Sequence, residues 1–361
     1  MKKKLLVLII ATLVVSMVSC GTKDINVTNE VKNNYEDNNE DELSKEKENK
    51  EEDKESNKIN EDENTINVTP EKVGELIRIG DCAVGAFGGV KEIAAQYAET
   101  ISDYAKILKD KSVYNIIIPT NIEFILPEKY SDLSVSQKDN IEFIKESESE
   151  EVKFVDAYSA LEEHKDEYVY FRTDHHWTAL GAYYAYCAYA DAAGFEPIKL
   201  KDYKVKKKDN FLGTYYGSTQ DQDLAKNPDY VEYYSVGADC KALIYKNSSL
   251  EDPMETTVYA DYAEGASSYG VFLHGDYPLV KIENKNSKTD KKVIVSKESY
   301  GNAFAPFLIP QYSEVYVVDL RYFKNNLVDF INENNIDDVI FINNIFAANT
   351  KIHIDSLNSM K

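Results

Sequence analysis

Cysteine is scarce in this chain of 361 residues, which contains only Cys20, Cys82, Cys187 and Cys240. These residues are widely spaced and include no C-x-x-C pair, which argues against a zinc site and against a disulfide scaffold. Basic residues are also few, because 41 Lys and Arg stand against 63 Asp and Glu, for a net charge of −22. This acidic balance argues against nucleic acid as a partner, since binding to phosphates depends on Lys and Arg.

An apolar run at the N-terminus covers residues 5–18 and follows three lysines at positions 2–4. It is too short for a comfortable membrane-spanning helix and has the layout of a secretory signal. Ser19 directly precedes Cys20, as in a bacterial lipobox, so we predict that residues 1–20 are a lipoprotein signal peptide and that Cys20 is lipidated. Acyl chains on Cys20 would anchor an extracytoplasmic protein at the cell membrane without spanning it. The alternative is an ordinary cleaved signal.

Residues 21–70 contain almost no apolar side chains and more than twice as many acidic as basic ones. Such a segment does not bury enough apolar surface to offset the entropy lost on ordering. We therefore predict a disordered acidic tether that lifts the folded part off the membrane surface. The remaining residues, 71–361, are enough for one large domain, and no second low-complexity linker divides them.

Strand and helix patterns alternate along the folded part, apart from an irregular insertion at about 198–270. Short apolar runs predict strands at 115–118, 152–156, 292–296, 314–319 and 338–342, and helical spacing predicts helices at 90–109, 157–164, 178–193, 300–308 and 325–334. Strand–helix–strand units imply right-handed crossovers, so we predict an α/β fold with a mostly parallel sheet covered on both faces. Active sites in such folds gather at the carboxyl ends of the strands.

The run Arg-Thr-Asp-His-His-Trp-Thr at 172–178 carries the strongest chemical signal. If the run is extended, Asp174 and His176 share one face, while His175 and Trp177 point to the other. A carboxylate that holds the Nδ1–H of an imidazole leaves Nε2 free to take a proton from a nucleophile, so the pair predicts two members of an acyl-transfer triad. Three consecutive residues are not expected to bind one ion, so we predict no metal site at 174–176. We also predict no cofactor. Trp177 is predicted to be a core residue.

The third member should be a nucleophile at the carboxyl end of a strand, just before a helix. Ser299 fits, because it follows the predicted strand 292–296 and precedes Tyr300 and the predicted helix 300–308. Unpaired N–H groups and the dipole at a helix N-terminus stabilise a developing oxyanion, and Tyr300 is a candidate for binding the oxyanion or the substrate. The alternative role of Ser299 is a helix N-cap. The G-x-S-x-G elbow is absent, which disfavours the α/β-hydrolase fold.

Two further positions are weaker candidates for substrate binding or oxyanion stabilisation. Arg321 follows a predicted strand and could bind an anionic or hydroxyl-rich substrate, or simply form an ion pair with Asp319. Asn344 follows the last strand and could donate to an oxyanion, or serve as a turn residue. His274 and Asp276 have the same spacing as the pair described above and are a rival for the base and its orienting carboxylate.

The segment 173–183 resembles the signature of the DHHW family of bacterial surface proteins, which are similar to the alginate O-acetylation proteins with an SGNH-hydrolase-like domain. The resemblance extends from about residue 75 to the end and includes the segments 119–123, 211–216, 275–281 and 293–304. It implies an SGNH-hydrolase-like three-layer domain in which Asp174, His176 and Ser299 form the triad. Family members usually carry Asp before the serine, where this chain has Glu298.

The resemblance implies an extracytoplasmic serine-dependent O-acetyltransferase or acetylesterase that modifies a cell-surface or exported polysaccharide. An acetyl supply outside the cell implies a membrane-bound O-acyltransferase as partner. Transfer and hydrolysis differ in how well the pocket excludes water, which the sequence does not determine, although the resemblance favours transfer. The alternative is a non-catalytic SGNH-like surface protein that binds glycan or partner proteins.

Overall fold

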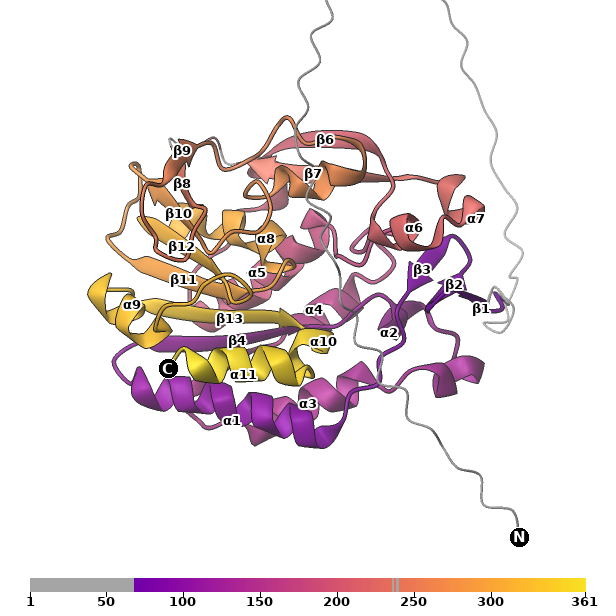
Figure 1. Cartoon of the computed structure of the whole chain (residues 1–361), viewed down its shortest axis with the longest axis horizontal. Helices are drawn as coiled ribbons and strands as arrows, with labels where there is room; N and C mark the ends of the chain where they lie inside the picture. The colour runs from indigo at the N-terminus through magenta and orange to yellow at the C-terminus, as the bar shows by residue number, and fades with distance from the viewer. Residues whose placement is uncertain (1–67, 236, 238–239) are drawn as a thin grey trace, which may run out of the picture. The chain divides into compact units, whose positions relative to one another are not determined.

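The computed structural model describes residues 68–235, 237 and 240–361 (Figure 1). The predicted signal peptide, Cys20 and nearly all of the predicted tether lie outside these residues. The described residues form one compact unit. Within the described ranges, no helix combines the length and apolar character needed to cross a membrane.

An eight-stranded sheet forms the centre of the unit, in the order β5-β4-β13-β11-β12-β10-β8-β9. The strands are β4 (Ser112–Ile118), β5 (Val152–Val155), β8 (Cys240–Tyr245), β9 (Met254–Thr256), β10 (Leu279–Asn284), β11 (Lys292–Lys297), β12 (Glu314–Asp319) and β13 (Asp338–Asn344). The first five strands of this order, from β5 to β12, pair in parallel with their neighbours. The last three, β10, β8 and β9, form an antiparallel edge. The prediction of an α/β fold with a mostly parallel sheet is confirmed.

Helices cover both faces of the sheet, because the central strands are apolar on both sides. In β11, Val293 and Val295 pack into one core and Ile294 packs into the other. Figure 1 shows α1, α3 and α11 on one side of β4 and β13, with α5 and α8 on the other side. The first layer comprises α1 (Lys91–Ile107), α3 (Gln137–Ser147), α9 (Leu327–Glu333), α10 (Ile345–Ala348) and α11 (Lys351–Ser359), and the second comprises α4 (Ala157–Glu163), α5 (Ala179–Ala193) and α8 (Gly301–Phe304).

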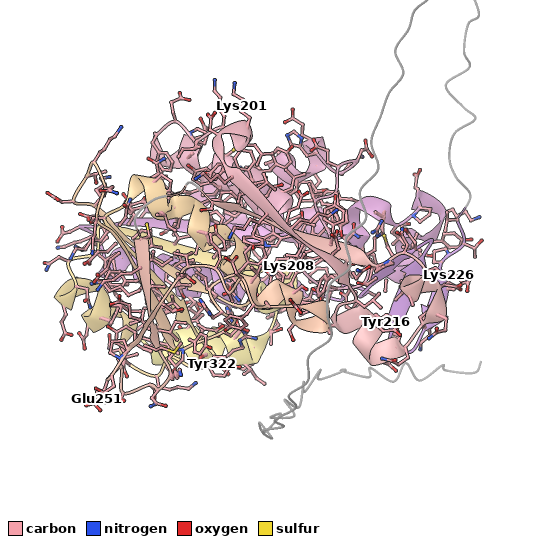
Figure 2. All side chains as sticks on the ribbon, turned by 90° about the horizontal axis from the view of Figure 1, so that it is seen from above. Lys201, Lys208, Tyr216, Lys226, Glu251 and Tyr322 are labelled. Atoms are coloured by element: carbon pink, nitrogen blue, oxygen red, sulfur yellow. The ribbon has the colours of Figure 1, made fainter. Side chains whose placement is uncertain are left out.

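The region predicted as an irregular insertion contains a separate two-stranded antiparallel sheet of β6 (Lys204–Phe211) and β7 (Asp229–Ser235). Two short helices, α6 (Thr214–Thr219) and α7 (Gln222–Ala225), follow β6 and precede β7 along the chain. Figure 2 labels Lys208, Tyr216 and Lys226 in this stretch. Residues after β7 form β8 and β9 and so belong to the central sheet. A three-stranded sheet of β1 (Glu71–Val73), β2 (Leu76–Ile79) and β3 (Cys82–Val84) was not predicted, because its strands are short and half exposed.

Helix α5 begins and ends where its sequence predicts. The Thr178 hydroxyl accepts from the N–H of Gly181 at 3.3 Å, and Gly194 ends the helix with φ of 76°. The residue before this cap, Trp177, is fully buried, and its Nε1 donates to the carbonyl of Tyr300 at 3.0 Å. The prediction of Trp177 as a core residue is confirmed, and the indole connects the start of α5 to the segment around Ser299.

A buried polar network joins α1 to β4, β13 and the end of α3. The Tyr97 hydroxyl donates to Asn115 Oδ1 and accepts from Asn343 Nδ2, both at 2.9 Å. The amide nitrogen Nδ2 of Asn115 donates to Glu148 Oε1, whereas Glu148 Oε2 is buried without a hydrogen-bond partner in the described part of the chain. Burial raises the pKa of Glu148 to about 8, so the folded protein keeps this carboxyl mostly protonated at neutral pH.

Glu148→Gln is expected to remove a pH-dependent loss of stability. A carboxyl whose pKa is raised by folding stabilises the folded state fully below its ordinary pKa of 4.5, and this stability is lost as pH rises through about 8. The difference in free energy of unfolding between variant and wild type should therefore grow in favour of the variant across that window. Urea titrations across the window measure it. Glu146→Gln, at an exposed position of α3, is the control, and a difference that does not change with pH would contradict the account.

Candidate active site

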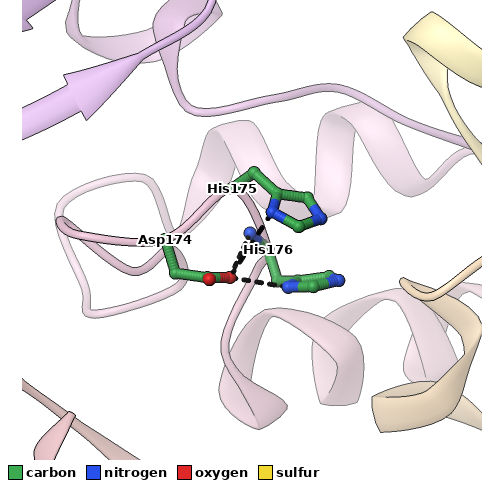
Figure 3. A group of neighbouring side chains, drawn as sticks. All are labelled: Asp174, His175 and His176. Atoms are coloured by element: carbon green, nitrogen blue, oxygen red, sulfur yellow. Dashed lines mark hydrogen bonds and ion pairs between the residues drawn. The ribbon is translucent and has the colours of Figure 1, made fainter. Parts of the chain in front are cut away.

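The run that precedes α5 is bent, so the prediction that His175 and His176 point to opposite faces is wrong. The N–H of His176 donates to Asp174 Oδ1 at 3.0 Å, which closes an Asx-type turn and interrupts the extended chain. As a result both imidazoles lie beside Asp174 (Figure 3), and their ring centroids are 3.7 Å apart.

The structure brings Asp174, His176 and Ser299 together. His176 Nδ1 lies 2.6 Å from Asp174 Oδ1, and His176 Nε2 lies 2.8 Å from Ser299 Oγ. Asp174 and His176 are 3% and 6% exposed, whereas Ser299 is half-buried, so the serine is the member that a ligand reaches. Burial opposes the ionisation of Asp174, but the two imidazoles and hydrogen bonds outweigh it and hold the pKa of this carboxyl well below its ordinary value. An ionised Asp174 accepts the Nδ1–H and leaves Nε2 to accept the serine proton.

The second oxygen of Asp174 is held by the start of α6. The N–H and the hydroxyl of Thr214 donate to Asp174 Oδ2 at 2.8 and 2.9 Å. Gly213 permits this approach, because a Cβ at that position would stand 2.3 Å from the Cβ of Asp174 and 2.4 Å from its Oδ2. The residues of α6 were not predicted as site residues; the only sequence signal was the family resemblance at 211–216.

Tyr269 covers the imidazole of His176. The two rings stack with centroids 3.7 Å apart and planes 11° apart, and the Tyr269 hydroxyl donates to the carbonyl of Ser299 at 3.0 Å. The tyrosine thus restricts the rotation of the imidazole and holds the serine segment against it. Sequence reasoning missed Tyr269, since nothing in its neighbourhood distinguishes it from the other 26 of the 27 tyrosines.

Ser299 lies in a turn directly after β11 and does not cap a helix through its side chain. The N-cap of α8 is Tyr300, which makes no side-chain capping bond. The predicted helix is only four residues of α-helix, followed by 3₁₀ turns at Ala305–Gln311, so a helix dipole contributes less here than expected. The Ser299 hydroxyl instead contacts His176 and, at 3.3 Å, Glu298 Oε2.

Glu298 joins the carboxyl ends of β11 and β13. Its Oε1 accepts the N–H of Asn344 at 2.9 Å, and its Oε2 accepts the N–H of Tyr300 at 3.2 Å. Burial raises the pKa of Glu298 and these backbone donors oppose the rise. Asn344 is therefore beside the site, and its Oδ1 also accepts from the N–H of Ala347 at 3.0 Å as the N-cap of α10. The carboxylate of Glu298 thus holds the backbone directly after Ser299 and connects it to the end of β13.

Arg321 forms ion pairs with two neighbouring aspartates. Its Nε and Nη2 donate to Asp319 at 2.9 and 2.7 Å, and Nη2 also lies 2.7 Å from Asp276. The same two carboxylates bind the ammonium of Lys297, which is 2% exposed. The predicted ion pair of Arg321 with Asp319 is thus present, whereas its predicted contact with substrate stays a prediction.

Tyr300, His274 and Asp276, the remaining predicted positions, form hydrogen bonds or ion pairs with other parts of the protein. The Tyr300 side chain is buried and its hydroxyl donates to the carbonyl of His175. His274 and Asp276 do not form a pair, because Asp276 binds Lys297 and Arg321, while a ring nitrogen of His274 lies 2.8 Å from the carbonyl of Thr257. The rival pair is therefore not assembled.

Asp174, His175 and His176 offer ligand atoms that lie within 4.8 Å of one another. Hydrogen bonds already engage both nitrogens of His176 and the Nδ1 of His175, which lies 2.7 Å from Thr214 Oγ1. This arrangement favours proton transfer over metal ligation.

Comparisons with known proteins identify the family and the fold. A family model described as "DHHW protein" matches residues 14–318. A DHHW family protein from Eubacterium siraeum is 32% identical, with a TM-score of 0.73 over 81% of this chain and 97% of that chain. Bacillus cereus PatB1, solved with a sulfonyl adduct, is 20% identical, with a TM-score of 0.66 over 82% of this chain and 99% of that chain.

A further solved structure, the O-acetyltransferase domain of Pseudomonas putida AlgJ, is 13% identical over 81% of this chain and 100% of that chain, with a TM-score of 0.44. No curated protein matches this chain. The similarity to PatB1 confirms the predicted SGNH-hydrolase-like fold class.

Proposed function

Because the chain belongs to the DHHW protein family, we propose that it is a serine-dependent O-acetyltransferase or acetylesterase. Its substrate is a cell-surface or exported polysaccharide. The observation that carries the proposal is the continuous hydrogen-bond chain from Asp174 through His176 to the half-buried Ser299. The choice of acetyl group and polysaccharide rests on the family resemblance.

In the first half-reaction, Ser299 Oγ attacks the carbonyl carbon of the acetyl donor. His176 Nε2 takes the serine proton and then gives it to the leaving group, while Asp174 stabilises the imidazolium that forms between these steps. The N–H of Ser299 and the Nδ2 of Asn344 are the donors that we assign to the oxyanion. The Asn344 amide is suited to this role because its N-cap bond fixes the orientation of the side chain.

In the second half-reaction, an acceptor hydroxyl attacks the acetyl-serine ester. His176 removes the proton of this hydroxyl and returns it to Ser299 Oγ as the ester bond breaks. A sugar hydroxyl gives an acetylated glycan, and water gives acetate.

The proposed location rests on the N-terminal sequence. We propose that a lipid on Cys20 anchors the protein outside the cytoplasm and that residues 21–70 span the distance to the glycan. A membrane-bound O-acyltransferase would supply the acetyl group as partner.

Incubation with an activated aryl acetate and defined oligosaccharides, followed by mass spectrometry of the products, tests the function. Acetylated oligosaccharide supports a transferase, and release of acetate without it supports an esterase. Neither product from the folded protein would overturn the proposal in favour of a non-catalytic surface binder.

Gly213→Ala is expected to lower kcat on the aryl acetate by about a hundredfold, since a displacement of a catalytic group by roughly 1 Å costs that much. The new methyl group would displace the Asp174 carboxylate from the imidazole. Gly217→Ala is the matched control, because Gly217 lies in α6, of which Gly213 is the N-cap, and has nothing within 4 Å of the added Cβ. Circular dichroism checks that both variants fold, and a folded Gly213→Ala with the kcat of wild type would contradict the role of this close approach.

A further inference from the structure

The hydrogen bonds of Thr214 determine which nitrogen of His175 carries a proton. The Thr214 hydroxyl lies 2.9 Å from Asp174 Oδ2 and 2.7 Å from His175 Nδ1. A hydroxyl has one proton to donate, and an ionised carboxylate only accepts. The Thr214 proton therefore goes to Asp174, and the Thr214 oxygen accepts the Nδ1–H of His175.

This proton arrangement leaves Nε2 of His175 with a lone pair and without a proton. Burial lowers the pKa of His175 to about 4, so the ring is neutral at neutral pH. The exposed end of the ring is thus a hydrogen-bond acceptor and does not compete with His176 as a base.

The Nε2 atoms of both histidines face the same space. Figure 3 shows the Nδ1 side of each ring toward Asp174 and the remaining nitrogens pointing to the same side. The ring planes are 37° apart, and the His175 side chain is 37% exposed, against 7% for His176. A ligand whose hydroxyl reaches His176 Nε2 at Ser299 can therefore place a second hydroxyl on His175.

We propose that His175 binds the acyl acceptor and selects a vicinal diol over an isolated hydroxyl, a proposal that rests on the proposed function. One hydroxyl attacks the acetyl-serine and loses its proton to His176. The adjacent hydroxyl donates a hydrogen bond to His175 Nε2 and keeps its proton. Adjacent hydroxyls of a pyranose are about one hydrogen-bond length apart, roughly 3 Å, which suits the 3.7 Å between the ring centroids.

The same hydrogen bond discriminates between the two second half-reactions. A sugar diol brings the two hydroxyls at a fixed spacing, so the bond to His175 positions the attacking oxygen. A water molecule lacks the second hydroxyl and gains no positioning from His175. The contact therefore favours transfer over hydrolysis.

The test compares a cyclohexanediol with adjacent hydroxyls and cyclohexanol as acceptors, with an aryl acetate as donor. Wild type should show a kcat/KM per hydroxyl about three- to tenfold higher for the diol, the factor that one neutral hydrogen bond contributes. His175→Phe should abolish this preference by weakening transfer to the diol, and His175→Gln, whose amide oxygen reaches the Nε2 position, should restore part of it. His164→Phe is the control, since His164 lies after α4 and stacks on Tyr184.

The role of His175 and the proposed function fail separately. If wild type forms an acetyl-enzyme but prefers neither acceptor, or if His175→Phe keeps the preference, only the role of His175 is overturned. If wild type forms no acetyl-enzyme, both are overturned. Heteronuclear NMR of the imidazole nitrogens gives a check on the unaltered protein. A Nδ1–H tautomer whose Nε2 resonance shifts on addition of the diol supports the proposal, and a Nε2–H tautomer contradicts it.

Discussion

Ser299→Ala is expected to lower kcat for hydrolysis of an activated aryl acetate by about a thousandfold or more. The methyl group does not attack a carbonyl carbon, so no acetyl-enzyme forms and only the oxyanion donors and substrate binding remain. The fold should be retained, because the Ser299 side chain is half-buried and bonds only within the site. Steady-state kinetics and circular dichroism measure the two expectations.

The chain provides a matched control for this variant in the same segment. Ser296 lies in β11, is fully buried, and its hydroxyl has no hydrogen-bond partner among the described residues. Ser296→Ala should therefore keep the activity of wild type. Equal turnover in Ser299→Ala and Ser296→Ala, with both variants folded, would eliminate Ser299 as the nucleophile.

Asp174→Asn has the second largest expected effect, a fall in kcat of about a thousandfold to ten-thousandfold. The amide NH2 of an asparagine at this position donates to His176 Nδ1, where the carboxylate accepted the Nδ1 proton. The imidazole proton is then forced onto Nε2, and the ring no longer accepts the serine proton. Substrate binding is not expected to change as much, because Asp174 is 3% exposed and is not in reach of a ligand.

Kinetics and NMR together identify the cause of this loss. The fall should occur in kcat with a smaller change in KM, and the NMR spectrum should show the proton of His176 on Nε2. Asp156→Asn is the control, since Asp156 caps α4 by accepting from the N–H of Ser159 at 3.0 Å and Asn caps equally well. An Asp174→Asn variant with nearly full kcat would show that the carboxylate does not set the tautomer.

The sequence predicted the parallel strands well because β4, β11, β12 and β13 are buried on both faces and therefore read as continuous apolar runs. It predicted Ser299 at the carboxyl end of a parallel strand, and the triad chemistry of the Asp174–His176 pair required a nucleophile beside it. The ranges of β1 to β3 and of β6 to β10 were not predicted. They are short or carry polar residues, so their pairing depends on neighbours distant in the chain.

The details of the site were less predictable. The position of His175 depends on whether the Asp174 carboxylate accepts a hydrogen bond from the nearby backbone N–H of His176. This bond competes with the extended conformation, and the two-residue alternation of a strand does not predict it. Thr214 and Tyr269 reach the site only because β6, β7 and the segment after them fold over it. The catalytic roles of Asp174, His176 and Ser299 stay predictions that the geometry supports.

Covalent labelling with an arylsulfonyl fluoride tests the central claim most directly, because the adduct forms only on an activated nucleophile and survives peptide mapping. The account predicts one sulfonyl group per chain, located on Ser299, with labelling that slows strongly in Asp174→Asn. A folded wild-type protein that is labelled elsewhere, or not at all, would contradict it.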